Sequence, residues 1–182
     1  MAWRLQELPD SYLVPPALAA TYDALYLHGG VKYSGETVRD LSSLDLATGR
    51  WARLHTDGAQ PTAPSGHSLV AVRGRLLLLG ARRDHLISPK NSPPAALQPD
   101  RAHADEDLEL PPAAELWMLE VGRQASSVAG GGATSLPLRW ERHPIPAPLS
   151  RLEHCAAPHE AAGTMLVVGG TSGASGRLLD DV

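Results

Sequence analysis

Three residues near the end of the chain carry side chains that proteins use to bind zinc. His154, Cys155 and His159 lie within six positions of one another, and imidazole and thiolate groups are common zinc ligands. Such ligands must converge in space, whereas adjacent residues of a β-strand point to opposite faces. The pattern therefore favours structural roles, and we predict no metal and no cofactor. The same divergence argues against Ser68 and His67 as a nucleophile and its base.

Two glycines raise a second possibility, a phosphate-binding loop. Gly29 and Gly30 end the apolar run "LYLHGG" of residues 25–30. A phosphate loop continues with Lys and Ser or Thr into a helix, but here the chain reads "GGVKYSG", and a later pair reads "GGTSGASG". Glycine at the end of a buried strand allows positive φ and close backbone approach. We therefore interpret the pair as the turn at a strand end.

The glycines belong to an internal repeat. "LYLHGG" (25–30) returns as "LLLLGA" (76–81) and as "MLVVGG" (165–170). Trp3, Trp51 and Trp140 precede the first glycine of these blocks by 26, 29 and 29 residues. Self-similarity with a period of roughly 20 to 50 residues is typical of repeat architectures. The chain is therefore predicted to consist of repeated structural units.

Each repeat is predicted to hold four short strands. The block "DLSSLDL" (40–46) matches "ELWMLEV" (115–121), and a third copy begins at Asp181. The remaining segments are "ALAATY" (17–22), "GHSLVAV" (66–72), "EHCAAP" (153–158), "WARL" (51–54) and "WERH" (140–143). Short aliphatic runs bounded by Gly, Pro or Thr-Gly indicate strands. The predicted fold class is all-β, with four-stranded antiparallel units.

At these residues the chain resembles the kelch-repeat β-propellers, whose blades begin with Arg-x-Gly-His and carry a double glycine. The resemblance is carried by Gly66-His67-Ser68, the glycine pairs at 29–30 and 169–170, "LDLATGRW" (44–51), and Asp181 with Val182. Ala81 replaces a second glycine, and Pro64 stands where the family usually has Arg. A narrower similarity, of "LYLHGGVKY" and "SRLEHCAAPHEAAGTMLVVGG", is to attractin-type kelch blades of large extracellular receptors.

The resemblance implies a division of the chain into blades. Residues 1–8 are expected to form the outer strand of a preceding blade, 16–56 blade 1, 63–145 blade 2, and 151–182 an incomplete blade 3. Blade 2 carries inserted loops at 84–112 and 122–138. About two and a half blades make an incomplete ring, since propellers close with at least about four. We expect a truncated piece of a larger protein, with completion of the ring by a second chain as the alternative.

The resemblance also implies a non-catalytic scaffold for protein–protein interaction. Loops on one face of the ring are expected to present a cationic rim, formed by Lys32, Arg82, Arg83, Arg151 and Arg177. Arginine pairs well with planar carboxylates, so this rim would suit an acidic peptide segment of a protein partner. Scattered solubilising charge is the alternative interpretation.

An enzyme on the same ring is the second function class. Copper radical oxidases of this architecture need a Tyr cross-linked to Cys, together with Tyr and His ligands. The four tyrosines, Tyr12, Tyr22, Tyr26 and Tyr33, all lie in the first blade, far along the chain from Cys155. We therefore predict that the chain is not an enzyme, and keep as the alternative a fragment of a copper-oxidase-like enzyme whose active-site residues are not present.

Net charge and the length of the apolar runs argue against nucleic acid and membrane as partners. The net charge is −4 without a long basic run, so no nucleic-acid groove is predicted. The longest apolar runs have about four or five residues, far below the roughly 20 that span a membrane, so membrane insertion is not predicted. The compartment stays open: a complete chain without a signal peptide would be cytoplasmic, whereas a fragment of an attractin-type receptor would be extracellular.

Overall fold

The computed structural model describes residues 12–14, 16–61, 66–80, 114–121, 137–145, 151–152, 154–172 and 177–181. Within these ranges the chain forms strands and turns and no helix, so no helix there is long and apolar enough to cross a membrane. The all-β prediction is confirmed. The expected outer strand at 1–8, Arg82 and Arg83, the insert at 84–112 and residues 122–136 of the second insert lie outside the described residues.

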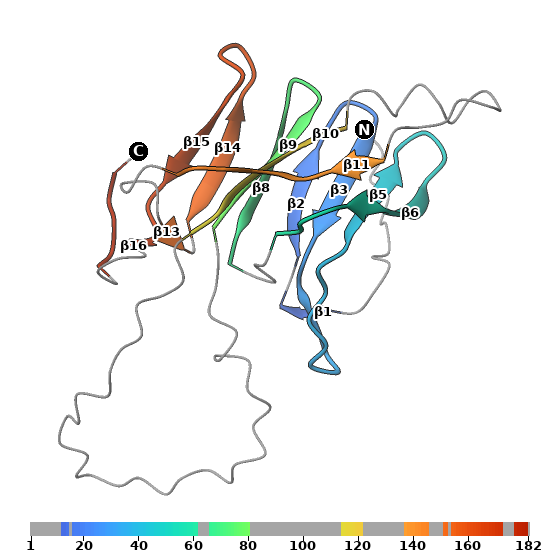
Figure 1. The fold of residues 1–182 in the computed structure, drawn as a ribbon, viewed down its shortest axis with the longest axis horizontal. Helices are drawn as coiled ribbons and strands as arrows, with labels where there is room; N and C mark the ends of the chain where they lie inside the picture. Colours follow the sequence, from blue (N-terminus) through green and yellow to red (C-terminus); the bar gives the residue numbers. More distant parts are fainter. Residues whose placement is uncertain are drawn as a thin grey trace, which may run out of the picture.

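Three principal sheets follow one another along the chain (Figure 1). The first sheet has the order β2 (Ala17–Ala20), β3 (Ala24–His28), β5 (Leu41–Asp45) and β6 (Arg50–Leu54). The second sheet has the order β8 (Ser68–Val72), β9 (Arg75–Leu79), β10 (Leu116–Glu120) and β12 (Glu141–His143). The third sheet pairs β14 (Cys155–His159) with β15 (Thr164–Val168). All these pairings are antiparallel, as predicted.

Short strand pairs connect the loops. They are β1 (Tyr12–Val14) with β4 (Val31–Lys32), β13 (Arg151–Leu152) with β16 (Thr171–Ser172), and β7 (Thr56–Asp57) with β11 (Leu138–Arg139). The last pair is parallel and joins the chain that leaves the first sheet to the chain that enters β12. Leu138 is buried in it, so the final residue of the expected insert at 122–138 belongs to the folded part.

The turn between β5 and β6 shows how the sequence reverses the chain. Oδ1 of Asp45 accepts the backbone N–H groups of Ala47 and Thr48, each at 2.8 Å. These hydrogen bonds, the one from Thr48 foremost, lower the pKa of Asp45. Gly49 then takes a φ of 68°, a conformation that glycine adopts without steric cost. The Asp-Leu-Ala-Thr-Gly segment therefore forms this turn through contacts within its own five residues.

The same backbone hydrogen bond recurs in all three repeats. In each repeat, the first glycine after β3, β9 or β15 donates its N–H to the carbonyl of the acidic residue that begins the next block, "DLSSLDL", "ELWMLEV" or the copy at Asp181. The pairs are Gly29 with Asp40 at 3.4 Å, Gly80 with Glu115 at 3.0 Å, and Gly169 with Asp181 at 3.1 Å. The three glycines have positive φ, of 77°, 116° and 64°. The spacing of glycines and acids in the sequence therefore corresponds to one repeated backbone geometry.

Trp51 of "WARL" and Trp140 of "WERH" occupy equivalent places in their sheets. Trp51 lies opposite Leu44 on β5. Trp140 immediately precedes β12, whose register on β10 pairs Glu141 with Met118, so the next position opposes Leu119. Trp140 is buried while Trp51 is half-buried. The difference arises because the first sheet covers the Trp140 side of the second sheet, whereas no described sheet precedes the first.

The sheets stack through their first strands, because β2 lies against β8 and β8 lies against β14. Figure 1 shows the hairpin turns of these strands on one edge of the stack and the glycine-containing loops on the other. The core between the first two sheets contains Ala19, Tyr26, Leu41, Leu69, Ala71, Leu76, Leu78, Trp117, Leu119, Val121, Leu138 and Trp140. Arg73, in the β8–β9 turn, donates hydrogen bonds to the backbone carbonyls of Glu160 and Ala161 in the β14–β15 turn. The described sheets do not close into a ring.

Removing a side chain from the interface between the first two sheets tests the stacking. Leu78 is 0% exposed within that core, and Leu78→Ala should lower the free energy of unfolding by roughly 2–5 kcal/mol through lost burial and a residual cavity. Urea unfolding followed by circular dichroism measures the change. The matched control is Leu178→Ala, because Leu178 is 79% exposed and should lose less than about 0.5 kcal/mol. Equal losses for the two variants would contradict the described core.

Candidate functional site

Two buried histidines meet at the junction of the first and second sheets. His28 ends β3 and His67 directly precedes β8, and Nδ1 of His28 lies 3.1 Å from Nε2 of His67. One ring must donate and the other must accept, so at least one imidazole is neutral. The His28 ring also contacts Trp140 edge-on, with 5.7 Å between ring centroids. Burial, and after it the charge of His67, lower the pKa of His28 to about 3.

A third buried histidine occupies the corresponding place between the second and third sheets. His154 directly precedes β14, as His67 precedes β8. A Cβ added to Gly80 would lie 3.2 Å from Cε1 of His154 and 3.2 Å from Cα of His67, so the glycine leaves room for both. Ser68 Oγ donates a hydrogen bond to the His154 carbonyl at 3.1 Å. Burial, and then the charge of Arg151, lower the pKa of His154 to about 4.

Arg151, one of the predicted rim residues, is buried in an ion pair. Its side chain is 3% exposed, and Nη1 donates to the carbonyl of Gly169 at 3.0 Å. Nη1 and Nη2 also bind the two carboxylate oxygens of Asp181, at 2.7 and 3.1 Å, a two-pronged geometry that strengthens the pair. The hydrogen bond from Arg151 lowers the pKa of Asp181. Arg151 therefore joins two segments of the third repeat and does not present its guanidinium at the surface.

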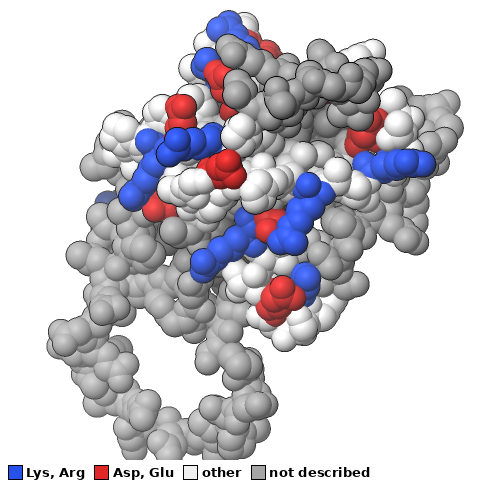
Figure 2. All heavy atoms as spheres, turned by 45° about the vertical axis from the view of Figure 1, so that its right-hand side comes forward, with Lys and Arg blue, Asp and Glu red and all other residues white. Residues whose placement is uncertain are grey.

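The remaining rim residues differ in how far the structure exposes them. Lys32 is partly buried, and its Nζ lies 3.2 Å from Oε2 of Glu36. Arg177 is exposed, whereas Arg82 and Arg83 lie outside the described residues. Figure 2 shows basic and acidic side chains interspersed on the face that it displays. Of the predicted rim residues that the structure describes, Arg177 is the most openly presented.

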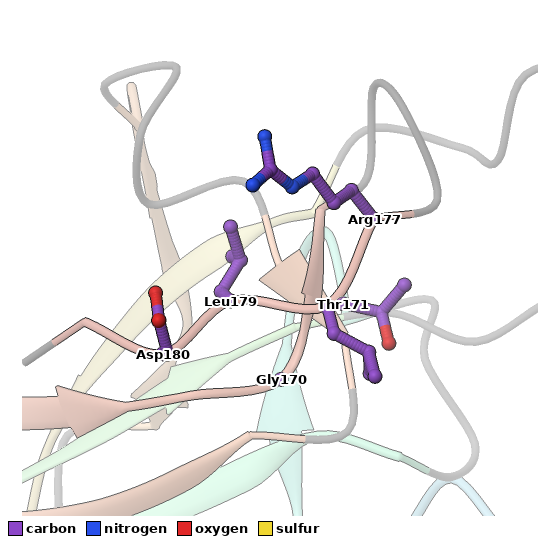
Figure 3. A pocket seen from close by; sticks show the side chains of 6 residues that line it. Gly170, Thr171, Arg177, Leu179 and Asp180 are labelled. Carbon is purple, nitrogen blue, oxygen red and sulfur yellow. The ribbon is translucent and has the colours of Figure 1, made fainter.

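A pocket opens beside Arg177 in the loop that follows β15 (Figure 3). It has a volume of about 500 Å³ and is lined by Gly170, Thr171, Arg177, Leu178, Leu179 and Asp180. The side chains of Arg177, Leu179 and Asp180 project to the same side of the loop in Figure 3. The pocket thus combines a cation, a carboxylate and apolar surface. Such a mixture suits a peptide segment with both polar and apolar groups.

The pocket loop has the same backbone frame as the loop of the first repeat. Leu179 N–H donates to the Gly170 carbonyl at 2.8 Å, as Val38 N–H donates to Gly30 at 2.9 Å. The amides of the first glycines are already bonded to backbone carbonyls, as described above, so they are not turned toward a phosphate. This arrangement agrees with the interpretation of the glycine pairs as turns at strand ends.

The side chains considered for chemistry are held in separate surroundings. His154 is buried, while Cys155 and His159 are exposed on β14, and among the described residues no group of three His, Cys, Asp or Glu could hold a metal ion. Tyr26 lies in the core between the first two sheets, where burial and then the charge of Asp23 raise its pKa. Cys155, by contrast, lies on the third sheet.

Sequence reasoning missed the roles of His28 and Arg151. For Arg151 a signal was present, because it stands three residues before His154 and matches the first residue of the Arg-x-Gly-His start. For His28 no comparable signal exists, since its partner His67 is 39 positions away. Pairing across sheets depends on their stacking, which local spacing does not contain.

Comparison of the chain with protein-family models and with curated proteins finds no match. A proposal for the function of this chain therefore depends on its repeat pattern and on the geometry of its sheets and loops.

Acidification should destabilise the protein through these histidines. Unfolded imidazoles bind a proton near pH 6.5, whereas His28 and His154 stay neutral in the folded chain down to about pH 3 and about pH 4. The unfolded state thus binds more protons below pH 6.5, so stability that is complete above this pH declines as the pH falls. For His28 alone the loss at pH 5 is about 2 kcal/mol.

Urea unfolding at pH 7.5 and pH 5 measures this dependence. His28→Gln should flatten it, whereas His55→Gln should not, because the His55 side chain is 90% exposed. A wild-type free energy of unfolding that is unchanged between the two pH values would contradict the described burial.

The Arg151 ion pair should require the guanidinium and not merely a positive charge. Arg151→Lys keeps the charge but loses the fork that binds Asp181 and Gly169 together. We expect a clear drop in melting temperature, measured by circular dichroism, and a comparable drop for Arg151→Met. Arg50→Lys, at an exposed position, is the control and should leave the melting temperature unchanged. Full stability of Arg151→Lys would show that the two-pronged contact is dispensable.

Proposed function

We propose that the three sheets are successive blades of a kelch-type β-propeller, present as an incomplete ring of about two and a half blades, and that the chain is a non-catalytic scaffold for protein–protein interaction. Two features support the architecture. The glycine-to-acid hydrogen bond recurs in every repeat, and the first strands β2, β8 and β14 lie side by side. Radially stacked blades are built in this way.

The burial and hydrogen bonding of the potentially reactive side chains support the assignment as a non-catalytic scaffold. His28, His67 and His154 are buried at the junctions between sheets, Ser68 binds a backbone carbonyl, and Arg151 is held by Asp181. A general base or nucleophile needs access to a substrate, whereas the three histidines and Arg151 are buried and Ser68 is only partly exposed. The loops beside the glycines then remain as the surface on which partners can differ.

An acidic peptide segment is the proposed partner at this edge. Arg177 lines the described pocket, and Arg82 and Arg83 follow Gly80 of the second repeat in the sequence. Arginine binds carboxylates with paired hydrogen bonds, and the adjacent leucines provide apolar contact. The proposed contact residues are therefore Arg82, Arg83 and Arg177, with Lys32 at the corresponding loop of the first repeat.

Fluorescence anisotropy with a labelled oligo-glutamate peptide at low salt tests this partner class. Arg177→Glu should weaken binding by roughly tenfold or more, since a hydrogen bond between charged groups contributes about 1.5–3 kcal/mol. Arg82→Glu with Arg83→Glu should weaken it further. Arg50→Glu makes the same charge change after the β5–β6 turn, at the opposite edge of the first sheet, and should have little effect.

Two results would count against the proposal. Equal weakening by Arg50→Glu and Arg177→Glu would show that net charge alone attracts the peptide. Tight copper binding that is lost in Cys155→Ser, measured by calorimetry, would instead favour a fragment of a copper-oxidase-like enzyme.

A further inference from the structure

A small hairpin after the first glycine pair holds an exposed tyrosine at its tip. Lys32 N–H donates to the Glu36 carbonyl, and Gly35 N–H donates to the Lys32 carbonyl, each at 2.9 Å. Gly35 has a φ of 84°, so the short loop that starts at Tyr33 ends in a left-handed glycine, a common way to close a hairpin. We call residues 31–37 the Tyr33 hairpin.

The base of the Tyr33 hairpin is fixed to the fold. Val31 forms a bridge with Thr37, and β4, which begins at Val31, pairs with β1. Val31 is 0% exposed, and Val38, the residue after the hairpin, is 7% exposed. In Figure 1 the hairpin extends past β1, away from the first sheet. Backbone hydrogen bonds and a buried base therefore hold the tip in one position.

The Tyr33 side chain does not close the hairpin. It is 72% exposed, and the hydrogen bonds at the loop join backbone groups of Lys32, Gly35 and Glu36. Lys32 and Glu36 also form an ion pair, with 3.2 Å between Nζ and Oε2, so the charges beside the ring balance. Tyrosine offers a partner an apolar ring and a hydroxyl group at a small cost in conformational entropy. The tip therefore presents a ring that a partner can contact.

We propose that the Tyr33 hairpin is a second contact element for the acidic peptide segment. The ring packs on the methylene groups of a peptide glutamate, and the hydroxyl donates a hydrogen bond to its carboxylate, whose charge strengthens the bond. The hairpin and the Arg177 pocket both lie on loops that follow a glycine pair. Because the hairpin is formed before binding, little conformational entropy is lost on contact. This inference rests on the proposed function and adds a neutral donor to its arginines.

Fluorescence anisotropy of the full chain with the labelled oligo-glutamate peptide tests the ring and the hydroxyl separately. Tyr33→Phe loses one hydrogen bond and should weaken binding roughly two- to tenfold. Tyr33→Ala also removes the ring and should weaken binding by about tenfold or more. Tyr22→Phe and Tyr22→Ala are the matched controls, because Tyr22 is fully exposed in the β2–β3 turn at the opposite edge. They should leave the Kd unchanged.

Two substitutions of Gly35 test whether the hairpin must be formed before binding. A Cβ at this position would meet no atom within 4 Å, so the effect of a side chain comes from the backbone conformation alone. Gly35→Ala is strained at this φ and should weaken binding severalfold, whereas Gly35→Asn, which tolerates the left-handed region, should bind like the parent chain. Circular dichroism should show intact sheets for both variants.

Chemical protection gives a measurement that needs no variant. Nitration of tyrosine rings by tetranitromethane, read by mass spectrometry of tryptic peptides, should slow severalfold at Tyr33 when the oligo-glutamate peptide is bound. Nitration of Tyr22 should be unaffected. Equal protection of the two rings, or protection of neither, would contradict a contact at the Tyr33 hairpin.

The binding results separate this inference from the proposal on which it rests. Absence of peptide binding to the parent chain would overturn both. Binding that Arg177→Glu weakens and Tyr33→Ala does not would overturn the role of the Tyr33 hairpin and leave the acidic partner in place. Equal weakening by Tyr22→Ala and Tyr33→Ala would show that exposed rings attract the peptide without regard to position, which also contradicts the inference.

Discussion

Packing of one aliphatic sheet face against the next is the interaction on which this structure depends. The third sheet has only two strands, and an isolated two-stranded hairpin is at best marginally stable in water. Leu69, Leu76 and Leu78 are almost fully buried in the core between the first two sheets. Stacking through β2, β8 and β14 thus stabilises the sheets and also fixes which side of each faces its neighbour.

Polar groups at the ends of the strands must adapt to this apolar packing. Buried imidazoles and guanidinium groups are costly unless they are hydrogen-bonded, and here His28 meets His67 while Arg151 binds Asp181. The glycines contribute in a different way, since Gly80 leaves room for the rings around it. The buried histidines therefore lie at the junctions between sheets, and Arg151 joins two segments within the third repeat.

Strand positions and repeat register could be predicted because they depend on local spacing. The segments before and after Gly29 and Gly169 form strands where alternation and turn residues place them, and Asp45 closes its hairpin with its own side chain. The position of Arg151 between two predicted strands indicates a loop on the cationic rim, yet its side chain is buried in the ion pair with Asp181. That pairing joins residues 30 positions apart, and only the folded third repeat brings them together.

The amino-acid sequence by itself determined the all-β class, the order of the strands and the places of the turns, because hydrophobic alternation and glycine conformations act within a few residues. Tertiary structure decided which equivalent residues are buried. Leu18 and Leu69 share one repeat position and one residue type, yet they are 53% and 5% exposed. The physical reason is that burial depends on whether another sheet packs against the residue, and such contacts form only when distant segments fold together.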